Sequence, residues 1–128
     1  MTDIQSIVAD GKVFVGTMAG ILHAMDDTTG KDIWAFKTPS AILHTYAVAG
    51  NKVFFGNANE KVYAVEAVGG RLVWSIQTGA ALWNAPAVHQ DMLLIGIRDG
   101  RIYALDAGDG EIKLAARTGG PLLSSYGV

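Results

Sequence analysis

Three histidines and a set of turn aspartates are the side chains that could support catalysis or metal binding. His23, His44 and His89 are far apart in the sequence, and the chain has no cysteine, which excludes disulfides and thiolate metal sites. Neither the ligand spacing of a calcium loop nor a Gly-x-x-x-x-Gly-Lys-Ser/Thr phosphate loop occurs. We therefore expect no catalytic residue, no metal site and no cofactor. The turn acids, which we interpret as solvated, are Asp26, Asp27, Asp106 and Asp109.

Four other residues have the chemistry of a binding surface. Trp83 and Asn84 precede a predicted strand, His44 occupies the position equivalent to Asn84, and Arg98 lies in a loop expected at the same end. An indole at such a place can be a platform for a peptide or a flat ligand. These residues predict a mouth that binds a protein or peptide partner. The alternative is that Trp83 only packs the entrance.

A repeat of forty residues reveals the elements that must position these side chains. It recurs three times without insertion, and chance cannot account for so many matching columns in one register. The columns include Val8, Val48, Val88 and Val128; Gly16, Gly56 and Gly96; Ala24, Ala64 and Ala104; Gly30, Gly70 and Gly110; and Thr38, Thr78 and Thr118.

Each repeat predicts four short strands and no helix. In the second copy the expected strands are 43–48, 52–56, 61–65 and 71–77, because apolar, β-branched and aromatic residues fill them while Gly, Asn and Asp fill the turns. The second strand of each unit is almost wholly apolar, as in Val13-Phe14-Val15, so both faces of the sheet should be covered. Four-stranded units with two covered faces are the blades of an all-β propeller.

A motif of Ala, an acid, Gly and Trp marks the end of each unit. It is complete as Ala24-x-Asp26-x-x-x-Gly30-x-x-x-Trp34, has Glu66 and Trp74 in the second copy, and ends in Leu114 in the third. This motif resembles the tryptophan-docking motif of the pyrroloquinoline-quinone-like (PQQ-like) propeller repeat family. The resemblance implies that the indoles lie between adjacent blades and that Leu114 makes a weaker junction. The predicted docking residues are Trp34, Trp74, Asp26, Asp106, Gly30, Gly70 and Gly110.

Three blades do not close a ring, since propellers have about four to eight blades. We expect one domain over residues 1–128, with repeats at about 9–48, 49–88 and 89–128. Segments 4–8 and 122–128 both read as inner strands, so a second copy could continue the repeat where this one stops. A head-to-tail homo-oligomer, with two chains forming six blades, is the favoured interpretation. The rival is a piece of a larger propeller whose other blades are missing.

Composition narrows the classes of function. The net charge is −2 and no basic patch occurs, so nucleic acid is not an expected partner. No apolar run is long enough to cross a bilayer, and residues 1–5 do not resemble a signal peptide. The resemblance nevertheless implies a periplasmic or extracytoplasmic location.

Three functions stay open at this stage. The first is a non-catalytic protein-interaction or scaffolding module. The second is a fragment of a PQQ-dependent quinoprotein dehydrogenase. The resemblance implies that such an enzyme would use quinone, calcium, an aspartate base and, in many members, adjacent cysteines that this chain lacks. The third is a free-standing set of repeats with no specific activity.

Overall fold

The computed structural model describes residues 5–9, 11–80, 82, 87–98 and 100–117, and these form twelve β-strands in three sheets. The first sheet holds β1 (Gln5–Ala9), β2 (Lys12–Gly16), β3 (Ile21–Asp26) and β4 (Asp32–Lys37). The second holds β5 (Ile42–Ala49), β6 (Lys52–Asn57), β7 (Lys61–Glu66) and β8 (Leu72–Gln77). The third holds β9 (Ala87–His89), β10 (Met92–Gly96), β11 (Arg101–Asp106) and β12 (Ile112–Arg117).

Every sheet is an antiparallel meander in which neighbours in sequence are neighbours in space. Tight turns allow this order: β5 and β6 pair from Ala49 and Lys52, with Gly50 at a φ of 61° in the two-residue loop. The strands predicted for the second copy agree with β5 to β8 within a residue at each end. No helix occurs in the described part of the chain, as the pattern predicts.

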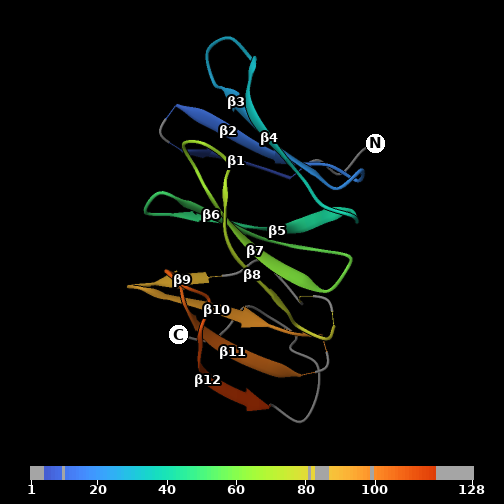
Figure 1. Ribbon diagram of the computed structural model, residues 1–128, viewed down its shortest axis with the longest axis vertical. Helices are drawn as coiled ribbons and strands as arrows, with labels where there is room; N and C mark the ends of the chain where they lie inside the picture. The colour runs from blue at the N-terminus through green and yellow to red at the C-terminus, as the bar shows by residue number, and fades with distance from the viewer. Residues whose placement is uncertain (1–4, 10, 81, 83–86, 99, 118–128) are drawn as a thin grey trace.

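The three sheets are stacked face to face along the long axis of the molecule (Figure 1). Across sheets, the Cα atoms that lie within 8 Å of each other belong mainly to the first strands, β1 with β5 and β5 with β9, and β2 also approaches β5. First strands that converge while the last strands splay apart are typical of blades around a central axis. The prediction of an all-β fold of three propeller blades is therefore confirmed, and we call the sheets the first, second and third blades.

Burial differs between the middle blade and the two outer blades. In the second blade, Val53, Phe54 and Phe55 of β6 are all buried, although their side chains alternate between the faces. In the first blade only one face of β2 is covered: Phe14 is buried, whereas Val13 and Val15 are half-buried. Continuous apolarity in β6 thus corresponds to two covered faces in the middle blade. Among the described residues, the first and third blades each have one face that no other blade covers, and we call these the open faces.

Two separate hydrophobic cores fill the spaces between the blades. The first core joins the first and second blades and includes Phe14, Leu22 and Phe55. The second joins the second and third blades and includes Phe54, Trp74 and Ile95. In the second and third strands of the blades, even-numbered residues of one blade meet odd-numbered residues of the next, so each junction is a packed interface of its own. We call them the first junction and the second junction.

Two expectations concern parts of the chain for which the structure gives no account. The predicted inner strand at 122–128 lies outside the described residues, and so does most of the loop that carries Trp83 and Asn84. Among the residues that are described, no helix is long and apolar enough to span a bilayer.

Candidate functional site

The first junction is pinned by Trp34, which lies on β4 at the outer side of the first blade. Its indole Nε1 donates a hydrogen bond of 2.9 Å to the carbonyl oxygen of Ala67 in the second blade. The ring lies over Gly70, where a Cβ atom would come within 2.5 Å of Trp34 Cε3. Only glycine leaves room for the indole there, and its φ of 73° also suits the turn.

The second junction repeats this arrangement one blade later. Trp74 Nε1 donates to the carbonyl oxygen of Ala107 over 3.0 Å, and the indole lies over Gly110. A Cβ atom at Gly110 would be 2.7 Å from Trp74 Cδ2. Phe54 packs beside Trp74 with its ring centroid 5.9 Å away. Each tryptophan therefore combines a large apolar contact with a satisfied N–H group.

The acids of the motif organise the glycine turns that follow the third strand of each blade. Asp26 Oδ1 accepts hydrogen bonds from the backbone N–H groups of Thr28 and Thr29, at 2.8 and 3.0 Å. These bonds favour the charged carboxylate, with that of Thr29 the stronger influence, and hold the pKa of Asp26 below its ordinary value. Asp106 Oδ1 accepts likewise from Gly108 over 2.7 Å. In the second copy Glu66 instead lies 3.4 Å from Arg71 Nε.

The two open faces carry unfilled halves of the same motif. Gly30 has a φ of 74°, like its counterparts, but a Cβ atom there would meet nothing within 4 Å. At the other end, Leu114 replaces tryptophan on β12 and is 64% exposed. Within the described residues, the first blade thus has a glycine turn with no aromatic ring above it, and the third blade has an apolar side chain with no glycine turn beneath it.

Arg101 and Phe36 distinguish the two junctions, and the sequence did not single them out. Arg101 Nη2 of the third blade donates to the carbonyl oxygen of Thr78 over 2.5 Å, and Nη1 donates to the Tyr103 hydroxyl over 2.6 Å. At the first junction Phe36 instead packs edge-on against Phe55 and Tyr63. The sequence indicated this difference only through a change of residue type at equivalent positions of the repeat, from Ile21 to Arg101 and from Phe36 to Ile76.

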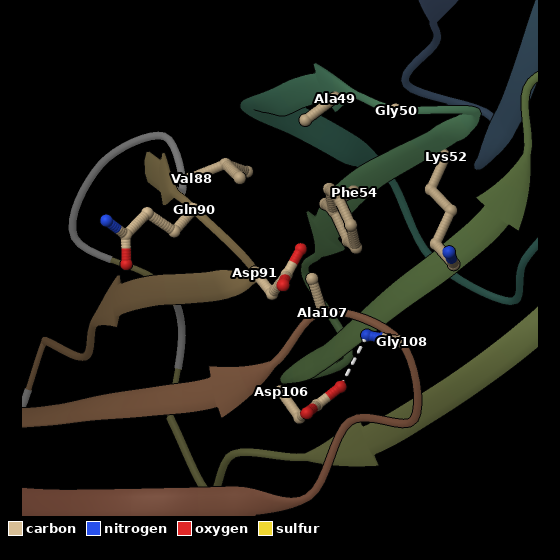
Figure 2. A pocket seen from close by; sticks show the side chains of 10 residues that line it. All are labelled: Ala49, Gly50, Lys52, Phe54, Val88, Gln90, Asp91, Asp106, Ala107 and Gly108. Atoms are coloured by element: carbon tan, nitrogen blue, oxygen red, sulfur yellow. Dashed lines mark hydrogen bonds between the residues drawn. The ribbon is translucent and has the colours of Figure 1, made fainter.

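A pocket of about 280 Å³ opens at the turn end of the second junction. Figure 2 shows Lys52 on its second-blade side and Asp91 and Asp106 on its third-blade side, with Phe54 between them. Sequence analysis did not predict this pocket. Its acid pair depends on Asp91 and Asp106 replacing Asn51 and Glu66 of the preceding repeat.

The predicted mouth lies largely outside the residues that the structure describes, so it stays a prediction. Trp83 and Asn84 lie outside the described residues, and His44 is described only as a backbone position in β5. Arg98 is exposed in the loop after β10. His23, which shares a column with Tyr63 and Tyr103, has its Nδ1 atom 3.3 Å from Asp32 Oδ2. No cluster of three or more metal-ligating side chains occurs in the portion of the chain that can be described.

Comparison with known families matches almost the whole chain. Residues 18–125 match the family described as outer membrane protein assembly factor BamB. A stretch of 31 residues is 55% identical to the lanthanide-dependent methanol dehydrogenase of Methylorubrum extorquens, but it covers 24% of this chain and 5% of that enzyme.

Solved structures show the same architecture at greater length. The structure of BamB from Moraxella catarrhalis is 28% identical with a TM-score of 0.77, over 89% of this chain and 35% of that one. A computationally designed protein, Ika8, has a TM-score of 0.80 at 20% identity, over 88% of this chain and 36% of its own. A europium-containing methanol dehydrogenase has a TM-score of 0.78 at 21% identity, over 94% and 26% of the two chains.

This chain therefore spans only about a third or less of these propellers. Its repeated acid, glycine and tryptophan turns, its three stacked blades and the match over residues 18–125 lead to one assignment. The chain belongs to the BamB-like family of PQQ-like propeller repeats.

Proposed function

We propose that this chain is a non-catalytic module that binds protein through the faces of its blades. The observation that carries the proposal is the pair of open faces, each of which holds one half of a contact already completed twice inside the chain. Leu114 of the third blade is 64% exposed, and Leu94, which lies on the same face of that blade, is only half-buried. Apolar side chains gathered on the face of a sheet are typical of surfaces that another protein covers.

Family membership supports the same class of function. The matching family carries the description of an assembly factor, and the BamB structure of Moraxella catarrhalis shares the blades described above. The family description and the exposed apolar face of the third blade both favour interaction as the function.

The finer proposal is head-to-tail self-association, with the third blade of one copy against the first blade of another. Two copies would then form six blades, a number within the range of closed propellers. Sedimentation velocity over micromolar concentrations tests this directly. We expect a particle of twice the chain mass that dissociates on dilution, and a monomer at every concentration would overturn self-association.

A fragment of a quinoprotein dehydrogenase is the second candidate. The observation that favours it is the stretch 55% identical to part of a methanol dehydrogenase. Reconstitution with pyrroloquinoline quinone and either calcium or a lanthanide, followed by a dye-reduction assay with methanol, separates the two functions. We expect no dye reduction above that of the free cofactor. Reduction that requires the protein would reject the non-catalytic proposal.

A further inference from the structure

We propose that the Gly30 turn of the first blade is a socket for residue 114 of a second copy of this chain. The inference rests on the self-association proposed above and identifies the atoms that would make the contact. It depends on three features of the first blade, each of which can be compared with the occupied turns of the other blades.

The first feature is the shape of the turn. Gly30, Gly70 and Gly110 have φ values of 74°, 73° and 78°. The N–H of Gly30 donates to the Asp26 carbonyl oxygen over 2.9 Å, and the equivalent bonds in the other blades are both 2.8 Å. The turn at Gly30 has therefore already adopted the conformation that receives an indole elsewhere in the molecule.

The second feature is the position of the acceptor. The carbonyl oxygens of Ala67 and Ala107 accept the indole N–H groups. Asp27 occupies the same column, and its N–H is anchored to the Gly11 carbonyl oxygen over 3.0 Å, as that of Ala67 is anchored to Asn51 over 2.7 Å. The backbone of Asp27 is thus held in the same way as that of the residue that accepts a bond from Trp34.

The third feature is the open space above the glycine. A Cβ atom at Gly70 or Gly110 would collide with an indole, whereas one at Gly30 would meet nothing within 4 Å. Gly30 is exposed, while Gly110 is buried beneath Trp74. The unfilled volume on the first blade therefore corresponds to the volume that a side chain of the preceding blade fills at both junctions.

The third blade supplies a side chain in the matching register. Leu114 pairs with Ala104 across β11 and β12, as Trp34 pairs with Ala24 and Trp74 with Ala64. Residue 114 consequently projects from the same face of its blade as the two docked tryptophans. Continuing the stack with a second copy would place Leu114 over Gly30 without changing the geometry of either blade.

Leucine fills this socket incompletely. It supplies apolar contact but has no N–H group for the Asp27 carbonyl oxygen. The contact between copies should then be weaker than the junctions within one copy. The variant Leu114→Trp would restore the missing donor and the larger apolar surface, so it should strengthen self-association.

The experiment measures the dimer dissociation constant of four proteins by sedimentation. These are the wild type, Leu114→Trp, and the tryptophan variant combined with either Gly30→Ala or Gly50→Ala. Gly50 is the matched control, because its φ is also positive and a Cβ atom there also meets nothing within 4 Å. Both alanine variants strain a turn, but only Gly30→Ala adds an atom beneath residue 114.

We expect Leu114→Trp to lower the dissociation constant by about tenfold or more relative to the wild type. Gly30→Ala should cancel this gain, and Gly50→Ala should change it by less than about threefold. Near-UV circular dichroism and thermal melts verify that all four proteins keep the fold. Equal effects of the two alanine variants, or no gain from Leu114→Trp, would overturn the socket even if the wild type self-associates.

One further outcome separates the socket from its occupant. A wild type that stays monomeric while Leu114→Trp dimerises through Gly30 would overturn the second copy as the natural occupant. The socket would then be assigned to a tryptophan-bearing blade of another polypeptide. The proposed self-association would fall in that case, whereas the chemistry of the Gly30 turn would stand.

Discussion

The two junctions of this molecule share one contact and differ in another. Both have a tryptophan whose N–H bonds a carbonyl oxygen of the next blade above a glycine turn. Away from that contact, the first junction is closed by Phe36 packed against Phe55 and Tyr63. The second junction has Ile76 in the place of Phe36, and Arg101 bonds across it to the Thr78 carbonyl oxygen.

The difference shows which part of a junction the repeat specifies closely. The tryptophan contact needs a glycine at a left-handed φ and a carbonyl oxygen in one position, so few substitutions are compatible with it. The rest of the junction needs only volume and satisfied polar groups, and an aromatic cluster or an arginine can provide these. The five predictions below test this division between a strict and a permissive part.

Removal of a docked indole should have the largest effect. Trp74→Ala and Trp34→Ala should each lower the free energy of unfolding by about 3–5 kcal/mol, as other large buried truncations do. We expect the larger loss for Trp74→Ala, because Trp74 is only 8% exposed whereas Trp34 is half-buried. Urea denaturation followed by circular dichroism measures both. A variant as stable as the wild type would contradict the docking role.

Arg101 should contribute less than the tryptophans to the free energy of unfolding, because it bonds across the second junction only. Arg101→Met keeps the aliphatic part of the side chain and removes the bond to the Thr78 carbonyl oxygen, at a cost of about 2 kcal/mol, typical of a hydrogen bond to a charged group. Lys61→Met, in the same column of the second blade, is the matched control. If both variants lose the same free energy of unfolding, the bond between the blades does not stabilise the fold, and the loss comes from removing a positive charge.

Phe36 provides the converse test at the first junction. Phe36→Ile gives the first junction the residue found at the second, and it removes two edge-on ring contacts at 6.1 and 5.8 Å. We expect a loss of about 1.5 kcal/mol from poorer packing and absent aromatic pairs. The same urea titration measures it. A loss as large as that of Trp34→Ala would show that the aromatic cluster, and not the indole, holds the blades together.

Much of this architecture can be predicted from the sequence, because the same pattern of strand and turn residues occurs in each of the three repeats. Apolar segments separated by glycine-containing turns predict the strands of each sheet. The spacing from Gly30 to Trp34 is the same as that from Gly70 to Trp74, so the sequence also predicts that the docking contact recurs. The location of the open faces also follows, since three blades leave two ends. None of these inferences needs knowledge of an individual side-chain conformation.

The parts that differ between repeats could not be predicted in the same way. A long arginine side chain can reach many carbonyl oxygens, and nothing in the column of Ile21, Lys61 and Arg101 selects Thr78. The pocket near Asp91 depends on how far two blades are apart at their turn ends, which no single blade determines. Such features arise from packing between repeats, and the sequence pattern describes the repeats themselves.

Glu60 stands at a position where the other two repeats have glycine, and this change of residue indicates backbone strain. Its φ is 62°, and the equivalent residues, Gly20 and Gly100, have φ values of 87° and 93°. A side chain in this left-handed region is strained. Glu60→Gly should therefore raise the free energy of unfolding by about 1 kcal/mol, although the flexibility of glycine in the unfolded chain offsets part of the gain.

Thermal melts of the glycine variant at several protein concentrations measure this change. Glu60→Ala is the control, because it removes the carboxylate and keeps the Cβ atom that causes the strain. The hydrogen bonds from the Thr78 N–H and hydroxyl to the Glu60 carbonyl oxygen, at 2.8 and 2.9 Å, should survive in both variants. Equal stabilisation by alanine and glycine would assign the effect to charge instead of backbone strain.

The smallest expected effect concerns Asp26, which begins the turn that forms the socket. Because the Thr29 and Thr28 N–H groups hold the pKa of Asp26 below its ordinary value, ionised Asp26 stabilises the folded state. That contribution is present above the unfolded pKa of about 4 and is lost as the pH falls through the lower folded value. Asp26→Asn should therefore lower the melting temperature slightly at pH 7 and have less effect in acid. If the two melting curves stay the same distance apart at every pH, the carboxylate does not stabilise this turn through its charge, and the first blade must hold the Gly30 conformation by its backbone bonds alone.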